Sequence, residues 1–333
     1  MEDTITQASA VAGAHAAFIQ LQAEAETKII GQPALVQRLL IALLTHGHLL
    51  VEGAPGLAKT TAIKVLAERI EGDFHRVQFT PDLLPADLTG TEIYRQQSGE
   101  FEFQPGPMFH NLVLADEINR APAKVQSALL EAMGEHQVTV GSTTYPLPDL
   151  FLVMATQNPI EQEGTYPLPE AQLDRFLMHV TIGYPDAEAE AKILHLARQQ
   201  AREELSDNTP PQVLVTQAQI FQAQNEVLDL NMVPELEAYI VQLVLASRDP
   251  SKFDPELVRM ISYGGSPRAT IALDRCARAY AWLAGRDYVS PDDIHAIAHD
   301  VLRHRLILSY EAEADGVTPD QVIQRLLEIV PVP

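Results

Sequence analysis

Cysteine is almost absent from this sequence, since Cys276 is the only one in 333 residues. A single cysteine cannot form a disulfide bond within the chain. Long apolar runs are absent too: the run "LLIALL" (residues 39–44) falls far short of the roughly 18 residues that a membrane-spanning helix needs. The first residues also lack the basic and then apolar pattern of a signal peptide. We therefore expect a cytoplasmic protein without a membrane segment.

Positive charge is scarce as well. The chain has 23 lysines and arginines against 45 aspartates and glutamates, which gives a formal net charge of -22. Such a chain repels a phosphate backbone, and it has no run rich in lysine or arginine that would bind one locally. We therefore do not expect nucleic acid as a partner, although a small basic patch assembled by the fold stays open.

The apolar residues are numerous enough for a globular core and are patterned along the chain. Hydrophobic residues make up 46% and charged residues 20% of the sequence. Helical spacing of apolar residues runs from Thr4 to about Lys28 and again from Pro33 to Gly47. From His48 onward, short apolar strands alternate with helices. The predicted strands are residues 48–53, 74–80, 111–117 and 150–157. This alternation indicates an α/β fold with a parallel sheet that is covered on both faces.

Two stretches interrupt the alternation of strands and helices. Residues 91–106 and 136–148 each alternate polar and apolar residues around a turn, at Ser98-Gly99 and at Gly141-Ser142. This pattern predicts two β-hairpin inserts, near 90–106 and 136–148. The aromatic residues Tyr94, Phe101 and Phe103 of the first hairpin suit either contact with a partner protein or packing onto their own chain.

The last third of the chain has a different pattern. After Asp186 the strand pattern stops, and a helix through about Glu204 leads into the polar, proline-containing stretch "SDNTPPQ" (206–212). Beyond it every segment has a helical pattern, and the openings Ser-Pro-Asp-Asp and Thr-Pro-Asp are typical helix starts. We predict an α/β domain over residues 1–204 and an α-helical domain over residues 205–333.

The stretch "VEGAPGLAKTT" (51–61) joins a predicted strand to a predicted helix through a glycine-containing loop. In this context, backbone N–H groups and the helix N-terminus surround phosphates, Lys59 neutralises the β and γ oxygens, and the Thr60 hydroxyl ligates Mg²⁺. The predicted nucleotide-binding residues are Gly53, Ala54, Pro55, Gly56, Leu57, Ala58, Lys59, Thr60 and Thr61. The alternative is a glycine-rich turn that contains a lysine by chance.

Ala58 departs from the usual phosphate-loop pattern, which has glycine directly before the lysine. Alanine is at no disadvantage there if the position has helical dihedral angles. Gly53 and Gly56 then remain for the tight turns.

A phosphate loop also needs acidic residues on a neighbouring strand. Asp116 and Glu117 follow the apolar residues of strand 111–117, at the carboxyl end where ligands bind in open α/β sheets. We expect Asp116 to hold the water shell of Mg²⁺ and Glu117 to polarise the attacking water. Alternatively, this Asp-Glu pair caps the next helix.

The polar residue Asn158 ends the buried-type strand 150–157. On an adjacent strand, its amide would contact the attacking water or the γ-phosphate. Because Asn-Pro also initiates turns, a purely structural role is the alternative.

Five motifs occur together in this order: "GAPGLAKT" (53–60), "LVLADEINR" (112–120), "ATQNP" (155–159), "LPEAQLDRF" (168–176) and "GGSPRA" (264–269). In this combination, over nearly the whole chain, the sequence resembles the MoxR family of AAA+ ATPases. The resemblance implies an AAA+ P-loop NTPase core with hairpin inserts and an α-helical lid. It also implies a ring oligomer, usually a hexamer, with ATP and Mg²⁺ bound between neighbouring subunits.

The same resemblance assigns roles to further residues by position. It makes Asn158 the sensor 1 residue, Arg268 the sensor 2 arginine of the lid and Arg175 the arginine finger that reaches the neighbour's nucleotide. The segment Ile30, Gly31 and Gln32 would line the adenine pocket. The two hairpins match the helix 2 and pre-sensor 1 inserts, which tend to face the central pore.

Local alternatives exist for these arginines. Arg175 could pair with Asp174 or Glu170, and Arg268 could be an ordinary exposed arginine in the first turn of a helix. Arg120 follows the Asp-Glu pair and is a second candidate for contact with a neighbour's nucleotide, or it pairs with Glu117.

The function expected from the resemblance is chaperone-like. MoxR proteins resemble chaperones that remodel or activate partners, often proteins with a von Willebrand factor A domain. This chain contains no such domain, so a partner of that kind would be a separate protein. Two other functions stay open: a nucleotide-dependent binding switch with slow turnover, and a DNA-stimulated motor, which the acidic composition disfavours.

Overall fold

The computed structural model describes residues 2–97, 99–159, 164–203 and 212–333. The chain forms two compact units. The α/β unit consists of Ala16–Leu168 and Val180–Ile220, and the helical unit consists of Met1–His15, Pro169–His179 and Phe221–Pro333. The predicted boundary stretch, residues 206–212, lies almost entirely outside the described residues.

The α/β unit is built on a five-stranded sheet with the order β2-β5-β8-β1-β9. The strands are β1 (Leu49–Gly53), β2 (Phe74–Gln78), β5 (Leu112–Asp116), β8 (Leu152–Gln157) and β9 (Met178–Ile182). The pairs β2–β5, β5–β8 and β8–β1 are parallel. The predicted parallel sheet is therefore confirmed, and its central strands are buried because helices cover both faces. The sequence pattern did not single out β9, which lies at the edge.

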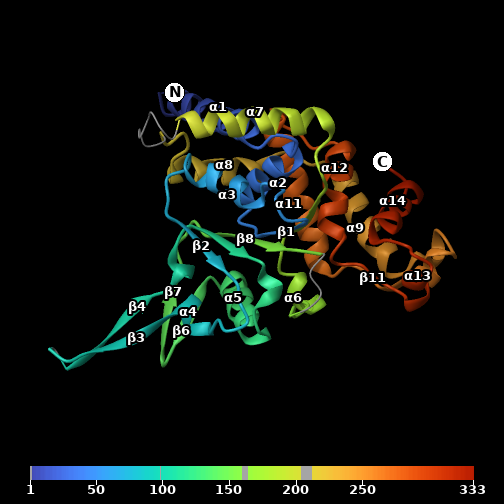
Figure 1. The fold of residues 1–333 in the computed structure, drawn as a ribbon. Helices are drawn as coiled ribbons and strands as arrows, with labels where there is room; N and C mark the ends of the chain where they lie inside the picture. The colour runs from blue at the N-terminus through green and yellow to red at the C-terminus, as the bar shows by residue number, and fades with distance from the viewer. Residues whose placement is uncertain (1, 98, 160–163, 204–211) are drawn as a thin grey trace. The chain divides into compact units, whose positions relative to one another are not determined.

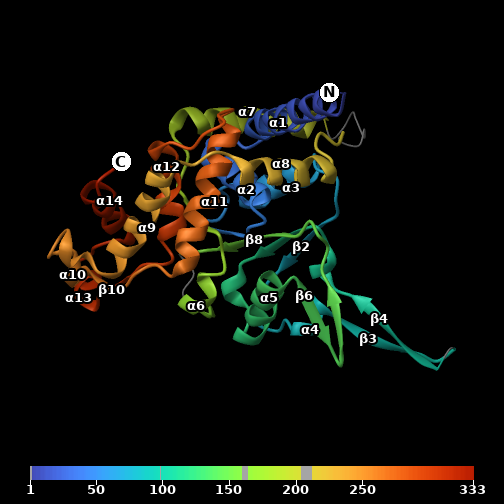
Figure 2. The same cartoon turned by 180° about the vertical axis from the view of Figure 1, so that it is seen from behind.

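Helices lie on both faces of this sheet. The helices of the α/β unit are α2 (Pro33–Leu44), α3 (Lys59–Ala67), α4 (Pro85–Thr89), α5 (Ala123–Glu135) and α7 (Ala187–Glu203), with short 3-10 turns at η1 (Pro107–Phe109) and η2 (Ile118–Arg120). Helices α2 and α3 lie on one face and α5 on the other (Figures 1 and 2). Two further helices, α1 (Glu2–Lys28) and α8 (Gln217–Asp229), contain residues of both units.

Both predicted hairpins are present in the α/β unit. Their strands are β3 (Gly90–Arg95) with β4 (Glu100–Pro105), and β6 (Gln137–Val140) with β7 (Thr143–Pro146). The first predicted turn includes Ser98, which lies outside the described residues, and the second is made at Gly141, which has φ +60°. Figure 1 shows β3 and β4 extending well away from the sheet.

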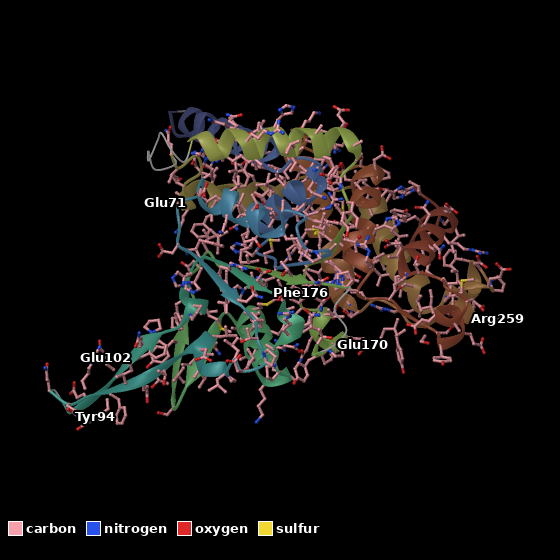
Figure 3. The ribbon with its side chains drawn as sticks, viewed as in Figure 1. Glu71, Tyr94, Glu102, Glu170, Phe176 and Arg259 are labelled. Atoms are coloured by element: carbon pink, nitrogen blue, oxygen red, sulfur yellow. The ribbon has the colours of Figure 1, made fainter. Side chains whose placement is uncertain are left out.

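The aromatic residues of the first hairpin divide into two groups. Phe103 stacks on Tyr145 of the second hairpin with ring centroids 3.9 Å apart, so it packs onto its own chain. Tyr94 and Phe101 face each other across the strands, and they are 52% and 68% exposed. Figure 3 shows Tyr94 on the outer part of this hairpin.

The helical unit confirms the helical pattern of the last third of the chain. Its main helices are α9 (Pro234–Arg248), α11 (Pro267–Leu283), α12 (Pro291–Leu302) and α14 (Pro319–Ile329), seen together in Figure 2, with the shorter α6 (Glu170–Leu173), η3 (Pro250–Lys252), α10 (Leu257–Met260) and α13 (Tyr310–Ala314). The predicted helix starts at Ser290 and Thr318 both form capping boxes.

One small sheet in the helical unit was not predicted. Strands β10 (Ile261–Tyr263) and β11 (Ile307–Leu308) pair in antiparallel fashion, so this part of the chain is not purely helical. The pairing joins residues that are far apart in sequence, and strands this short leave no alternating pattern to recognise.

Candidate functional site

The phosphate-loop sequence forms the link between β1 and α3. Gly53 ends β1 with its Cα packed so closely that an added Cβ would lie 2.4 Å from Ile182, so it provides a close approach and not a turn. Gly56 has φ +83°, which favours glycine. Ala58 has φ 57° and ψ 18°, which is left-handed and not helical. The position therefore lacks the helical dihedral angles at which alanine would carry no penalty. Alanine is at a disadvantage here of about 1–2 kcal/mol.

Lys59 begins α3 and its side chain points back to the carboxyl ends of two strands. The ammonium group donates to the carbonyl of Gly53 at the end of β1, and to the carbonyl of Gln157 at the end of β8, at 3.3 Å. The loop, the lysine and the ends of both strands thus meet at one edge of the sheet, as expected for a ligand site in a parallel sheet.

Asp116 lies at the end of β5 and is only 8% exposed. One carboxylate oxygen accepts a hydrogen bond from the Thr156 hydroxyl at 2.6 Å. The other accepts from Arg76 at 2.7 and 3.0 Å, and the Thr60 hydroxyl lies 3.5 Å from it. A buried carboxylate is stable when it is paired in this way.

Glu117 occupies a strained position next to Asp116. Its backbone is left-handed, with φ 57° and ψ 51°, a conformation that is costly for a residue with a Cβ and that is often found at active sites. Its N–H donates to the Thr156 hydroxyl at 2.9 Å. The carboxylate accepts from Gln78 at 2.7 Å and pairs with Arg120 at 3.2 Å. The side chain makes no capping bond to η2, so it does not serve as a helix cap.

Three residues around these carboxylates were missed by the sequence analysis: Arg76 and Gln78 on β2, and Thr156 on β8. Thr156 was detectable in principle, because it is a polar residue in a buried apolar run. Arg76 and Gln78 were not, because their role depends on β2 pairing with β5, with Gln78 opposite Asp116.

Asn158 follows β8 directly and is 5% exposed. It belongs to the same α/β unit as Lys59, Thr60, Asp116 and Glu117. Each of these residues either ends a strand or lies in the segment that follows one, and parallel strands end at a common edge of the sheet.

A pocket of about 290 Å³ lies beside the phosphate loop. Its walls come from the end of α1 and the segment after it, from the phosphate loop and the start of α3, and from α7 and the residues just before it. The lining residues are Lys28, Ile30, Gln32, Pro55, Gly56, Leu57, Ala58, Thr61, Tyr184, Pro185, Glu190, Ile193, Leu196 and Ala197. Gln32 donates to the carbonyl of Gly183 at 2.9 Å. An added Cβ at Gly31 would lie 3.1–3.2 Å from Ala189 and Pro185. Its walls combine apolar side chains with a few polar groups, as small-molecule pockets commonly do.

The two arginines assigned by resemblance belong to the helical unit. Arg175 follows α6 and is half-buried. Arg268 lies in the first turn of α11, its side chain is 58% exposed, and it pairs with Asp174 at 3.5 Å. The same Asp174 carboxylate accepts hydrogen bonds from Arg305 and Ser266, each at 2.9 Å.

His295 and His299 lie one helical turn apart on α12, a spacing that can bind zinc when a third ligand is present. His295 is hydrogen-bonded to the Tyr239 hydroxyl at 2.7 Å. Within the described ranges, no group of three or more histidine, cysteine or acidic side chains is placed to hold a metal ion. Likewise, none of the helices in those ranges is both long enough and apolar enough to cross a membrane.

Two family models match this chain. The model described as "ATPase family associated with various cellular activities (AAA)" covers residues 48–178, and the model described as "AAA lid domain" covers residues 258–326. The first match contains the phosphate loop, Asp116, Glu117 and Asn158, and the second contains Arg268.

Similar proteins span nearly the full chain. Chaperone MoxR1 of Mycobacterium tuberculosis is 48% identical over 93% of this chain and 81% of its own length. Protein MoxR of Methylorubrum extorquens is 32% identical over 95% of both chains. A crystal structure of a candidate ATPase from Cytophaga hutchinsonii has a TM-score of 0.91 and 46% identity, with 100% of both chains covered. The fold, the phosphate loop and these relatives together show that the chain belongs to the MoxR family of AAA+ ATPases.

Proposed function

We propose that this protein hydrolyses ATP at the subunit interfaces of a hexameric ring and uses the cycle to remodel or activate a separate partner protein. The observation that carries the proposal is the meeting of Lys59, Thr60 and the Asp116-Glu117 pair at one edge of the parallel sheet. Phosphoryl transfer to water requires positive charge near the phosphates and a carboxylate near the attacking water.

The residues present fit a Mg²⁺ ion together with ATP. The Thr60 hydroxyl and a carboxylate oxygen of Asp116 lie 3.5 Å apart, and both are the hard oxygen donors that Mg²⁺ prefers. When bound, Mg²⁺ supplies positive charge to the β and γ phosphates. Asp116 would reach it with the oxygen that now faces Thr60 and Arg76.

The other residues of the α/β unit take distinct roles in this proposal. Lys59 would exchange the carbonyls of Gly53 and Gln157 for phosphate oxygens, a stronger pairing of opposite charges. Glu117 would orient and polarise the attacking water. Gln78 and Arg120 would keep its carboxylate in a fixed orientation. Asn158 would contact the γ-phosphate or that water. The pocket lined by Ile30 and Gln32 would take the adenine.

The oligomer enters through the helical unit. Arg175 would act on the nucleotide of a neighbouring subunit, where such an arginine is worth on the order of 10³–10⁵ in rate. Arg268 would sense the nucleotide of its own subunit. The similarity to Chaperone MoxR1 supports a protein client, and a partner with a von Willebrand factor A domain fits the family.

Replacing Glu117 with glutamine tests the proposal. Because glutamine keeps the size of the side chain but loses the charge, Glu117→Gln should bind ATP with unchanged affinity and hydrolyse it at least about a hundredfold more slowly. ATP-loaded Glu117→Gln should then hold the ring and its client together, which size-exclusion chromatography with light scattering and mass spectrometry of copurified proteins would detect. Glu135→Gln, at the end of α5, is the matched control. Normal turnover in Glu117→Gln would remove Glu117 from the mechanism.

A further inference from the structure

The segment Pro169–His179, which carries Arg175, is held by the residues that follow α12. The Arg305 guanidinium donates to the carbonyls of Phe176 and Leu177, at 2.7 and 3.0 Å, and to the carbonyl of Asp174 at 3.3 Å. Its Nε donates to the Asp174 carboxylate at 2.9 Å. One arginine therefore fixes both sides of the Asp174–Phe176 backbone, with Arg175 between them. Figure 3 labels Glu170 and Phe176 of this segment.

The two residues before Arg305 add to this attachment. His304 is hydrogen-bonded to the carbonyl of Phe176 at 3.0 Å, and Arg303 donates to the carbonyl of His179. Burial holds the pKa of His304 well below its usual value, so the ring is neutral at physiological pH. The segment with Arg175 thus belongs physically to the helical unit.

The Asp174 carboxylate connects this segment to the start of α11. One oxygen accepts from Arg305, while the other accepts from the Ser266 hydroxyl at 2.9 Å and lies 3.5 Å from the Arg268 guanidinium. Ser266 also caps α11 by accepting the N–H of Arg268 at 3.1 Å. Asp174 is therefore in contact with Arg268 through space and bonded to Arg175 through the peptide chain.

The two ion pairs of Asp174 differ in strength. The Arg305 side chain is 3% exposed, so breaking its pair with Asp174 would leave a buried charge without compensation. The Arg268 side chain is 58% exposed and sits at a longer distance, so this pair is screened by solvent and weak. Arg305 therefore fixes Asp174, whereas Arg268 can leave it for a more strongly charged acceptor such as a triphosphate.

We propose that Asp174 is a positioning residue that couples Arg268 to Arg175, so that the contact of Arg268 with a nucleotide changes the placement of Arg175. The inference rests on the roles proposed above for these two arginines. While Arg268 is paired with Asp174, the carboxylate is shared among three partners. When Arg268 turns to phosphate, Asp174 keeps Arg305 and Ser266 alone, and the backbone that it shares with Arg175 relaxes toward them.

Asp174→Asn tests the coupling, because asparagine keeps the shape and an acceptor for Arg305 but removes the charge that attracts Arg268. The neutral amide attracts the buried Arg305 guanidinium less strongly than the carboxylate does, so the backbone that carries Arg175 is held less firmly. We expect kcat for ATP hydrolysis to fall about ten- to a hundredfold, since small misplacements of a catalytic group have effects of this size. The affinity for a fluorescent ATP analogue should be equal or higher, because Arg268 is released. Glu170→Gln, on the exposed face of the same segment, should change neither quantity.

A double-mutant cycle separates coupling from a general structural effect. If Asp174 acts through Arg175, Asp174→Asn should lower kcat by less than about twofold in an Arg175→Ala background. If the double variant loses kcat by the product of the two single losses, Asp174 does not act through Arg175 and the coupling is overturned. A loss of ATP affinity in Asp174→Asn that matches its loss of kcat would overturn it as well. If Asp174→Asn does not fold, as judged by its thermal unfolding, Arg305→Lys takes its place. The same expectations hold for kcat in both backgrounds, whereas ATP affinity should not rise, because the Asp174 charge that attracts Arg268 is kept.

The failure of the coupling is distinguishable from the failure of the proposed function. Normal kcat in Arg175→Ala would contradict the finger role, and the coupling would fall with it. A large loss in Arg175→Ala together with normal kcat in Asp174→Asn would overturn the coupling alone.

Discussion

Ala58 and Glu117 both adopt left-handed backbone conformations, one in the phosphate loop and the other beside Asp116. Left-handed dihedral angles bring the Cβ of an L-residue too close to its own backbone, so the surrounding structure must hold each residue in place. At Ala58 the side chain is only a methyl group, so glycine can remove the strain. At Glu117 the carboxylate is needed for the proposed chemistry, so glycine cannot take its place.

Ala58→Gly should therefore stabilise the protein by about 1 kcal/mol, because glycine adopts φ 57° without strain. Denaturant-induced unfolding without nucleotide would measure this. The matched control is Ala62→Gly within α3, where the backbone is right-handed and glycine should destabilise by about 1 kcal/mol. Equal destabilisation by both substitutions would show that Ala58 is not strained.

Thr156 connects the two acidic residues, since its hydroxyl donates to Asp116 and accepts from the Glu117 N–H. Thr156→Val keeps the shape but leaves the buried Asp116 carboxylate and the Glu117 N–H without this partner, so we expect a loss of about 1–3 kcal/mol in the free energy of unfolding. We also expect slower ATP hydrolysis, because both carboxylates shift. Thr156→Ser keeps the hydroxyl and should retain most of both properties. If valine and serine behave alike, the hydroxyl has no such role.

At the scale of elements, the two hairpins depend on each other. Phe103 of β4 and Tyr145 of β7 stack nearly in parallel, with an interplanar angle of 14°, and Phe103 also meets Phe109 of η1 edge-on at 5.5 Å. Strands β3 and β4 pair only with each other within the described residues, and a lone two-stranded hairpin is marginally stable. The stacked pair therefore supplies much of the support for the extended hairpin.

Phe103→Ala should loosen the β3–β4 hairpin, at a cost of about 0.5–1.5 kcal/mol from the lost aromatic pairing in addition to the lost burial. Hydrogen exchange of the amides of β4 should become faster while exchange in the buried strand β5 stays slow. Phe101→Ala removes a side chain that is 68% exposed and pairs with Tyr94 within the same hairpin, so it should speed exchange less than Phe103→Ala does. Equal rates in both variants would argue against the supporting role of Phe103.

At the scale of the whole molecule, the proposed ATP hydrolysis depends on a ring of subunits. Lys59 lies in the α/β unit and Arg175 in the helical unit, so the two side chains are carried by separate bodies of the chain. In a ring, Lys59 would serve the subunit's own nucleotide and Arg175 that of a neighbour. The net charge of -22 also opposes binding to a nucleic acid, which favours a protein as the partner of such a ring.

Mixing two inactive variants tests this arrangement. Lys59→Ala should lose nucleotide binding, and Arg175→Ala should bind ATP but hydrolyse it on the order of 10³-fold more slowly. Co-assembled rings should regain partial ATPase activity, because some interfaces combine an intact Lys59 with an intact Arg175. Mass photometry would establish co-assembly. A mixture that assembles and yet stays inactive would contradict action of Arg175 across the interface.

Much of the fold was predictable from the sequence because its signals are local. The alternation of strands and helices, both hairpins, and the helix starts at Ser290 and Thr318 each follow from a few consecutive residues. The edge strand β9 and the β10–β11 pair were not predictable, because each depends on a partner far away in the sequence.

The candidate site likewise has a part that was predictable from the sequence and a part that was not. By itself the sequence determined the loop with Lys59 and Thr60 and the acidic pair at the end of a strand, because each motif is contiguous and its chemistry follows from residue type. Only the tertiary structure decided that Ala58 is strained and that Arg76 and Thr156, each 40 residues from Asp116, hold its carboxylate. Only the tertiary structure, too, brought Arg305 to Asp174 across 131 residues. The physical reason is that backbone strain and the pairing of buried charges arise between neighbours in space, which strand order and helix packing select.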